Sequence, residues 1–245
     1  MPPTADVASN LAQIRQRISD AASRAHRDPA GITLLAVSKT FDADSVRAAA
    51  AAGQTHFGEN RVQEGLEKSA ALRDLPLEWH LIGHLQTNKA RKAAASFAWI
   101  HSVDRLELLR KLDEGAAAAG TRPNILLQVN LADEAQKSGA DEAAVTALAK
   151  AALEARALTL RGLMIIPPIP DDPEASRPWF RQLRELRDRL VAGGLPASSL
   201  TELSMGMSQD FAVAIEEGAT IVRVGTAVFG SRTTHGAPAH GAPGL

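Results

Sequence analysis

The chain has 245 residues, of which 45% are hydrophobic and 22% are charged, and its formal net charge is −1 at pH 7. This length suits one α/β barrel domain, and so small a net charge gives no global field that would attract nucleic acid or an anionic membrane. Cysteine is absent from the sequence, which excludes disulfides, thiolate metal sites and a cysteine nucleophile.

The first predicted elements are a helix and a buried strand. Residues 4–26 carry apolar side chains at helical spacing, which predicts an amphipathic helix ahead of the first strand. Residues 32–38 are mostly apolar and partly β-branched, as in a strand that is buried on both faces. Lys39 follows directly, and Asp42 is placed to cap a helix that ends at Gly53. Lys39 therefore stands at the carboxyl end of a strand, where α/β folds bind ligands, although a solvated loop lysine is the simpler alternative.

Further strands and helices alternate along the rest of the chain. Helical patterns cover residues 60–72, 86–95, 104–120, 141–156, 174–191 and 208–217. Asn60 is placed to cap the helix at 60–72, and Asp104 to cap the helix at 104–120. Short apolar runs predict seven more strands at residues 54–59, 77–82, 97–102, 124–131, 158–166, 200–203 and 219–224.

Eight such units predict a single α/β domain, a (β/α)₈ TIM barrel over residues 1–232 with an extra N-terminal helix. An open doubly wound sheet is the alternative, but the first strand–helix turn lacks the glycine pattern of dinucleotide-binding folds. Residues 233–245 are mainly Gly, Pro, Ala and His and predict a flexible C-terminal tail. Residues 1–10 contain no apolar signal segment, and no apolar run approaches the ~20 residues of a spanning helix. We therefore expect a cytoplasmic protein that binds neither nucleic acid nor a membrane.

Two loops near the end of the predicted barrel have the composition of phosphate sites. Residues 204–208 (SMGMS) follow the seventh strand, and Gly225 and Thr226 follow the eighth. Loops at these two positions of a barrel often bind phosphate through free backbone amides. Ser and Gly also make ordinary turns, so each loop is weak evidence by itself.

Three other polar residues lie at or near the same rim. Arg223 interrupts the apolar eighth strand, so it either contacts a ligand or pairs with an acid such as Glu59. His80, in the third strand, is more simply a buried histidine with satisfied hydrogen bonds, and Asn60 is more simply a helix cap. His235 and His240 have no useful metal-binding spacing, so we expect no metal site.

A lysine together with a phosphate site fits a phosphorylated carbonyl compound. Its phosphate would occupy the two loops, and its carbonyl carbon would form a Schiff base with Lys39. Pyridoxal 5'-phosphate (PLP) is the leading candidate.

A series of ordered motifs between residues 10 and 232 carries a family resemblance. They lie at residues 34–39 (LLAVSK), 57–60 (FGEN), 79–83 (WHLIG), 85–89 (LQTNK), 137–139 (KSG), 161–164 (RGLM), 203–208 (LSMGMS) and 223–226 (RVGT). With these motifs the chain resembles the pyridoxal phosphate homeostasis protein family (the YggS/PROSC group), whose barrel is similar to the N-terminal domain of alanine racemase.

The resemblance implies a role for each candidate residue. It implies that Lys39 carries PLP as a Schiff base and that Arg223 lies near the pyridine nitrogen. It implies that the phosphate is contacted by Ser204, Gly225 and Thr226. It also makes Asn60 and His80 residues of the pocket wall. Its implied function is intracellular PLP (vitamin B6) and amino-acid homeostasis, with apo PLP-dependent enzymes as candidate partners.

Two features argue against an amino-acid racemase. Racemisation needs a second base opposite the lysine, which in alanine racemase is a tyrosine, and this chain has neither tyrosine nor cysteine. A guanidinium beside the pyridine nitrogen also disfavours its protonation and makes the ring a poorer electron sink.

We therefore favour a PLP carrier without robust catalysis. The alternatives are a PLP-dependent enzyme, such as a weak racemase that uses His80 or water on the second face, and a Schiff-base aldolase without a cofactor. Because nothing in the chain corresponds to the second domain of alanine racemase, we expect a monomer rather than a dimer.

Overall fold

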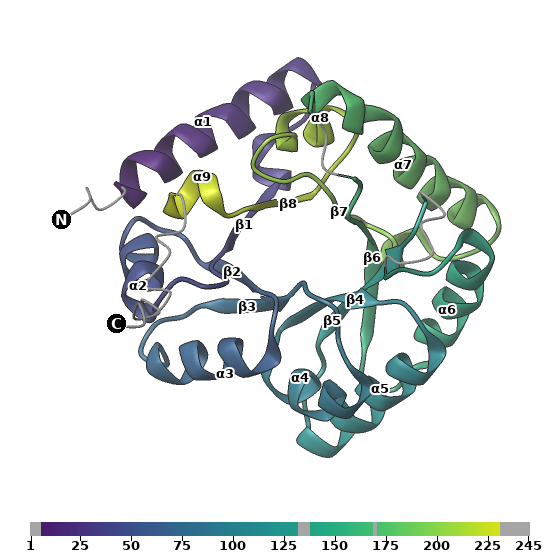
Figure 1. Ribbon diagram of the computed structural model, residues 1–245. Coiled ribbons are helices and arrows are strands. Elements are labelled where there is room, and N and C mark those ends of the chain that lie inside the picture. Colours follow the sequence, from purple (N-terminus) through teal and green to yellow (C-terminus); the bar gives the residue numbers. More distant parts are fainter. Residues whose placement is uncertain (1–5, 132–137, 169–170, 231–245) are drawn as a thin grey trace, which may run out of the picture.

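The computed structural model describes residues 6–131, 138–168 and 171–230. Eight parallel strands form a closed barrel in chain order, and β8 pairs with β1 to complete it (Figure 1). The strands are β1 (Thr33–Val37), β2 (His56–Glu59), β3 (Glu78–Leu81), β4 (Trp99–Val103), β5 (Asn124–Val129), β6 (Thr159–Ile165), β7 (Glu202–Ser204) and β8 (Ile221–Val224). The predicted (β/α)₈ barrel is confirmed.

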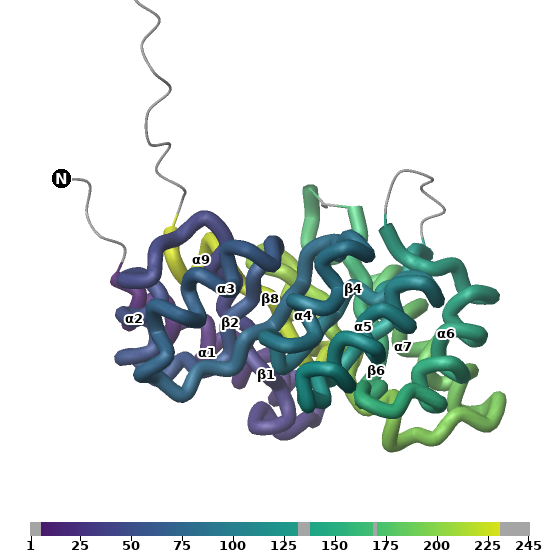
Figure 2. Tube along the Cα trace, turned by 90° about the horizontal axis from the view of Figure 1, so that it is seen from below, coloured from purple at the N-terminus to yellow at the C-terminus, as the bar shows by residue number. Residues whose placement is uncertain are grey.

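Helices surround the barrel on its outer side, as both ribbon and tube show (Figures 1 and 2). The α-helices are α1 (Val7–Arg24), α2 (Ala43–Ala51), α3 (Val62–Ala71), α4 (Ala90–Ser96), α5 (Leu106–Ala119), α6 (Glu142–Glu154), α7 (Arg177–Ala192), α8 (Phe211–Glu216) and α9 (Thr226–Phe229). Four 3₁₀ turns join them: η1 (Pro29–Gly31), η2 (Thr87–Lys89), η3 (Pro173–Ser176) and η4 (Ala197–Ser199). Within the described residues, the helices are all too short or too polar to cross a membrane.

The hydrophobic core has two parts, because alternate residues of a strand face opposite sides. Leu34 and Ala36 belong to the large cluster that packs the strands against the helices. Leu35 and Val37 belong to a smaller cluster, which fills the inside of the barrel. Both faces of β1 are thus buried, as its continuous apolar run predicts.

The predicted N-terminal helix, α1, packs against α2, α8 and α9, the helices that follow β1, β7 and β8. Its first turn is capped by Asp6, whose carboxylate accepts a hydrogen bond from the Ser9 amide at 3.0 Å. Leu11, Ile14 and Ile18 form its buried stripe. The helix after β8, α9, has only four residues, and α1 lies beside α8 and α9 where a longer final helix would otherwise pack (Figure 1).

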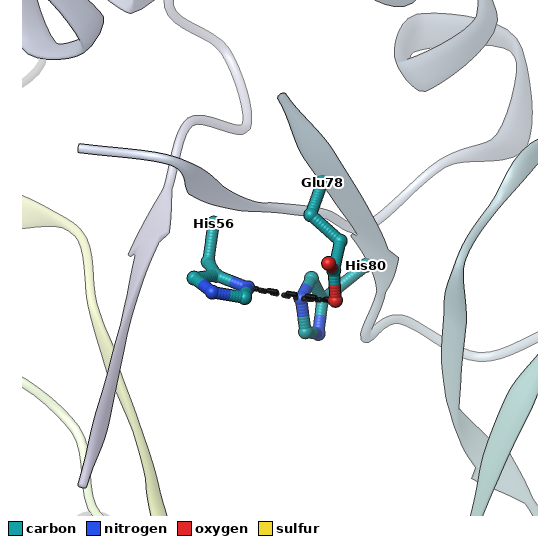
Figure 3. Close-up of side chains that lie close together, drawn as sticks. All are labelled: His56, Glu78 and His80. Carbon is teal, nitrogen blue, oxygen red and sulfur yellow. Dashed lines mark hydrogen bonds and ion pairs between the residues drawn. The ribbon is translucent and has the colours of Figure 1, made fainter. Parts of the chain in front are cut away.

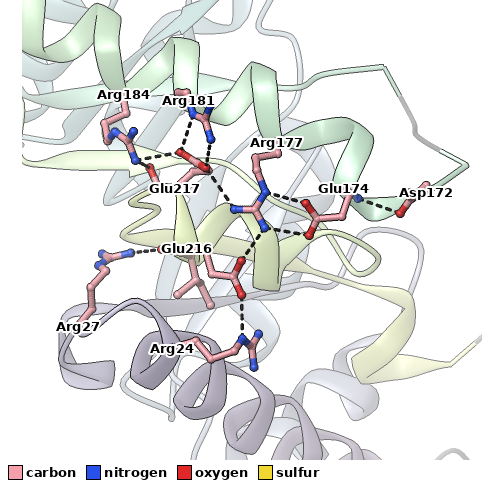
Figure 4. A network of polar contacts seen from close by, with 10 residues as sticks. Arg24, Arg27, Asp172, Glu174, Arg177, Arg181, Arg184, Glu216 and Glu217 are labelled. Carbon is pink, nitrogen blue, oxygen red and sulfur yellow. Dashed lines mark hydrogen bonds and ion pairs between the residues drawn. The ribbon is translucent and has the colours of Figure 1, made fainter.

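Arginines of two helices also hold the end of α8 (Figure 4). Glu217 is contacted by three arginines of α7, namely Arg177 at 3.2 Å, Arg181 at 3.0 Å and Arg184 at 2.9 Å. Glu216 pairs with Arg177 at 2.6 Å and with Arg24 of α1 at 2.9 Å. These contacts tie α1, α7 and α8 together around the last part of the barrel.

Two of the predicted helix caps are wrong. Helix α3 has Arg61 as its N-cap, so Asn60 lies outside the helix. Helix α5 has Arg105 as its N-cap, and the Asp104 carboxylate accepts a hydrogen bond from the Arg105 guanidinium instead of from a helix amide. A charged donor outcompetes a backbone amide for the same carboxylate. The predicted tail, residues 233–245, lies outside the described residues, so its boundary with the barrel stays a prediction.

Candidate functional site

A cavity of about 670 Å³ opens at the carboxyl ends of the strands. Five of the residues singled out in the sequence line it, although they are far apart in the chain: Lys39, Asn60, Arg223, Gly225 and Thr226. Closure of the barrel explains this, because β1 and β8 are neighbours and Leu35 pairs with Arg223. The predicted association of the strand-one lysine with the last strand is therefore confirmed.

Lys39 stands in a tight turn directly after β1. The Phe41 amide donates to the Ser38 carbonyl at 3.0 Å, and Thr40 has a φ of +69°. Positive φ at the third position of such a turn is usually taken by glycine or asparagine, and a β-branched residue there is strained. Strain of this kind persists where surrounding contacts hold the backbone. The turn leaves the Lys39 side chain exposed on the cavity wall.

The contacts that hold this turn come from Lys68, a buried lysine of α3. Its ammonium donates to the Ser38 carbonyl at 2.6 Å and to one carboxylate oxygen each of Glu59 and Glu64 at 2.8 Å. The Ser38 hydroxyl donates to Glu59 at 2.6 Å, and the Thr40 amide donates to Glu64 at 2.6 Å. Burial raises the pKa of Glu59, against the opposing effect of the hydrogen bonds from Lys68 and Ser38. The residues on both sides of Lys39 are thus tied to one ammonium group.

Arg223 forms the floor of the cavity from β8. It is 4% exposed and donates to the Ser204 hydroxyl at 2.7 Å and to the Ile165 carbonyl at 2.8 Å. Burial lowers the pKa of Arg223 to about 10, so the guanidinium is still protonated at pH 7. The alternative of an ion pair with Glu59 is wrong, because Glu59 is bound by Lys68 and Ser38. A buried positive charge therefore lies under the cavity that Lys39 also lines.

The loops after β7 and β8 meet at the cavity. The Gly225 amide donates to the Ser208 hydroxyl at 3.3 Å, and both residues line the cavity. Gly206 has a φ of +88°, and a Cβ there would lie 2.5 Å from the Ala214 Cβ. A Cβ on Gly225 would lie 3.2 Å from the Val37 carbonyl oxygen. Gly206 thus allows the first loop to lie close to α8, and Gly225 allows the second to lie close to β1 at the cavity wall.

Two predicted site residues lie beneath the cavity and do not line it. Ser204 is fully buried, and its hydroxyl lies between the Arg223 guanidinium and Nδ1 of His101, which is 3.0 Å away. His80 is 1% exposed and contacts the rings of His56 and His101 within the barrel. The interpretation of His80 as a buried, hydrogen-bonded histidine is confirmed.

The cavity also contains polar residues that the sequence did not single out. Ser208 belongs to the loop that was predicted, but Ser204 was chosen in its place. Gln128 is a polar residue that follows the apolar run of β5, and its amide donates to the Ser138 carbonyl at 2.9 Å. His84 also lines the cavity, and its Nδ1 lies 3.1 Å from the Ser138 hydroxyl. A polar side chain within a buried strand is the signal that could have identified Gln128.

Known proteins resemble this chain over almost its whole length. The family described as "Alanine racemase, N-terminal domain" matches residues 9–233. A "Pyridoxal phosphate homeostasis protein" of Pseudomonas aeruginosa is 50% identical over 233 residues, covering 95% of this chain and 98% of the relative. The chain belongs to the pyridoxal phosphate homeostasis protein family. The resemblance carried by the sequence motifs is therefore confirmed.

Solved structures agree with this family assignment. PipY of Synechococcus elongatus PCC7942, solved with PLP bound, is 44% identical with a TM-score of 0.81, covering 91% of this chain and 100% of PipY. The alanine racemase of Streptomyces coelicolor A3(2) has a TM-score of 0.64 at 24% identity, covering 91% of this chain and 59% of the racemase. The second likeness shows the fold alone: this homeostasis-family barrel corresponds to one part of the racemase.

Proposed function

We propose that this chain binds PLP as a Schiff base on Lys39 and serves as a cytoplasmic PLP carrier in vitamin B6 and amino-acid homeostasis. The observation that carries the proposal is the presence of an exposed primary amine, a buried guanidinium and two glycine-containing loops in one cavity of about 670 Å³. When bound, the cofactor supplies an aldehyde that exchanges reversibly between amines. Relatives named for PLP homeostasis, and PipY with PLP bound, support the same assignment.

The loops after β7 and β8 fit a phosphate group. The amides of Gly225 and Thr226 and the hydroxyl of Ser208 come from two adjacent loops on one side of the cavity. A cradle of backbone amides and hydroxyls recognises phosphate oxygens as hydrogen-bond acceptors. We assign the serine contact to Ser208, because Ser204 is buried under Arg223.

Arg223 favours holding the cofactor over carbanion chemistry. A guanidinium can only donate hydrogen bonds, so a ring nitrogen facing it must act as the acceptor. Its bonds to Ser204 and to the Ile165 carbonyl keep the group in place, and it stays charged at pH 7. An unprotonated ring withdraws electrons less strongly, while exchange of amines at the aldehyde does not need that electron sink.

The cavity also tests the alternative of a weak racemase. His80 is separated from the cavity by the residues above it, so it cannot act as a second base there. His84 lines the cavity and is half exposed, with 52% of its side-chain surface accessible, and it is the candidate base for this second function.

Borohydride reduction and peptide mapping test the main proposal. We expect the protein loaded with PLP to absorb visible light and, after reduction, to retain the cofactor on the peptide that contains Lys39. Lys39→Ala should abolish both signals, and Lys89→Ala, which removes an exposed lysine from η2, should preserve them. A colourless protein after incubation with PLP, or labelling that persists in Lys39→Ala, would refute the proposal. Faster PLP release to an apo acceptor enzyme than to buffer would indicate direct transfer.

Chiral analysis after prolonged incubation with L-alanine tests the second candidate. Turnover that His84→Gln removes would establish racemase activity. Absence of D-alanine formation would leave the carrier as the function of the site.

A further inference from the structure

His56, Glu78 and His80 converge at the opposite end of the barrel from the cavity (Figure 3). His56 is the first residue of β2 and pairs in register with Glu78, the first residue of β3. Glu78 and His80 are two residues apart in the same strand, so their side chains face the same side. The closed barrel therefore directs two imidazoles and one carboxylate toward a common point near the amino ends of the strands.

The spacing of the three donor atoms matches a small metal ion. Nδ1 of His56 lies 3.1 Å from Nε2 of His80, and Oε1 of Glu78 lies 3.6 Å from the first nitrogen and 3.7 Å from the second. Ligands on a tetrahedral zinc ion, with bonds of about 2.0–2.2 Å, stand roughly 3.3–3.5 Å from one another. The three atoms thus surround a point at about the zinc bonding distance, without any movement of the backbone.

Two of the three side chains are partly open to solvent. The side chains of His56 and Glu78 are 33% and 42% exposed, whereas His80 is at 1%. Burial, together with the neighbouring rings of His101 and His56, lowers the pKa of His80 well below its ordinary value. The innermost imidazole is therefore neutral at pH 7, the form that binds metals.

Neighbouring groups hold two of these ligands in place. Nδ1 of His80 lies 3.0 Å from Nε2 of His101, on the far side of the ring from the proposed ion, and the Trp99 indole donates at 2.5 Å to Oε1 of Glu78, the oxygen that faces both histidines. The Trp99 ring also stacks on His80, with 5.5 Å between the ring centroids and 3° between the planes. Metal-binding histidines usually carry such a partner on the second nitrogen, which fixes the ring and raises its affinity.

We propose that His56, Glu78 and His80 form a binding site for a divalent cation of the zinc class, with solvent as a further ligand. Two imidazoles and one carboxylate with an open position are a common ligand set for zinc. This differs from the expectation of no metal site, which considered only histidines near one another in sequence. The competing explanation is a hydrogen bond between His56 and His80 that holds the rings together without an ion. The proposal does not depend on PLP binding.

Calorimetric titration of the full chain with ZnCl₂ tests the site. All samples carry His235→Gln and His240→Gln, so that tail histidines do not contribute, and are treated with chelator beforehand. We expect one zinc ion per chain, with affinity weakened at least about tenfold by His56→Gln or Glu78→Gln. His26→Gln, which removes an exposed histidine after α1, should leave the affinity unchanged. Circular dichroism shows whether each variant is folded.

Trp99 supplies a second measurement that locates the ion. Co²⁺ at the site should quench tryptophan fluorescence in the parent protein. Trp99→Phe should remove more of that quenching than Trp179→Phe, because Trp99 and Trp79 lie in the strands that carry the site and Trp179 lies in α7. Zinc binding that is absent at 100 µM, or that His56→Gln and Glu78→Gln leave unchanged in folded protein, would overturn the proposal. Quenching that Trp179→Phe removes and that Trp99→Phe leaves unchanged would do so as well, because the ion would then lie near α7.

Discussion

The ammonium of Lys68 lies 2.6 Å from the carbonyl oxygen of Ser38, the residue that precedes Lys39. The same ammonium binds Glu59, which accepts the Ser38 hydroxyl, and Glu64, which accepts the amide of Thr40. One buried lysine therefore positions the backbone on both sides of a second, exposed lysine. This arrangement explains how Lys39, the proposed Schiff-base lysine, can be accessible while the turn that carries it is held in place.

Lys68→Met should reduce stability strongly. The substitution leaves Glu59 buried without its counter-charge, and breaking one side of a buried ion pair typically costs about 3–5 kcal/mol. Urea unfolding measures the loss. Adding Glu59→Gln should recover part of it, because no unpaired buried charge remains. Lys92→Met, at an exposed position of α4, is the matched control and should change stability little. Equal stability of Lys68→Met and the control would contradict the positioning role.

Ser208→Ala should weaken the binding of PLP relative to pyridoxal, which lacks the phosphate. Loss of one hydrogen bond to a charged group, about 1.5–3 kcal/mol, corresponds to a change of roughly tenfold or more in this ratio. Ser204→Ala should instead lower stability, because it removes the hydroxyl between Arg223 and His101. Binding assays with both ligands separate the two roles. If the affinity for PLP relative to pyridoxal falls in Ser204→Ala and not in Ser208→Ala, Ser204 is the phosphate contact and our assignment is wrong.

Ser204 is buried and Ser208 lines the cavity, and this difference in depth is what a sequence pattern cannot resolve. The alternation of apolar strands with helices predicts the barrel. The end of the first strand places Lys39 at its rim. The seventh strand was expected to end at residue 203, but β7 continues to Ser204. Since side chains of a strand alternate between its faces, an error of one residue moves a serine from the loop into the barrel. His80 lies too deep within β3 to line the cavity, whereas Ile82, just past the end of that strand, does line it.

Gly206→Ala should destabilise the loop after β7. A Cβ at this position would lie 2.5 Å from the Ala214 Cβ and 2.9 Å from the Phe211 Cα, in a backbone conformation with φ +88°. Backbone strain of about 1 kcal/mol and the cost of overpacking, about 1–3 kcal/mol, should add. Gly194→Ala is the matched control, because its φ is +98° but no atom lies within 4 Å of its Cβ. Thermal unfolding should show the smaller loss for Gly194→Ala; equal losses would mean that the steric contact at Gly206 is relieved by movement.

Arg223→Gln should change the visible absorption of the loaded protein. An uncharged amide removes the protonated guanidinium that we place beside the ring nitrogen, so the electron distribution of the bound chromophore should alter. Absorption spectra across pH measure the effect, with Arg61→Gln as a control on an exposed arginine. An unchanged spectrum with retained binding would show that Arg223 does not contact the ring.

Glu217→Gln should lower the free energy of unfolding at neutral pH. It should also make that free energy fall less steeply as the pH decreases. Burial acts to raise the pKa of Glu217, but hydrogen bonds from Arg181 and Arg177 outweigh it, and the pKa lies below the ordinary 4.5. A carboxylate whose pKa is depressed by folding contributes stability that is present above pH 4.5 and is lost as pH falls through the folded value. At pH 7 the variant should therefore be less stable by about 1–2 kcal/mol, since hydrogen bonds to a charged group are lost.

Urea unfolding between pH 7 and pH 3 checks this prediction. The difference in unfolding free energy between the parent protein and Glu217→Gln should become smaller as the pH drops below about 4.5. Glu114→Gln provides the comparison, because Glu114 pairs with Lys111 at 2.8 Å on an exposed face of α5. Exposed ion pairs are screened by solvent and contribute little to stability, so this variant should follow the parent closely. A gap for Glu217→Gln that stays constant with pH would mean that the arginines of α7 stabilise α8 by packing and not through the charge of Glu217.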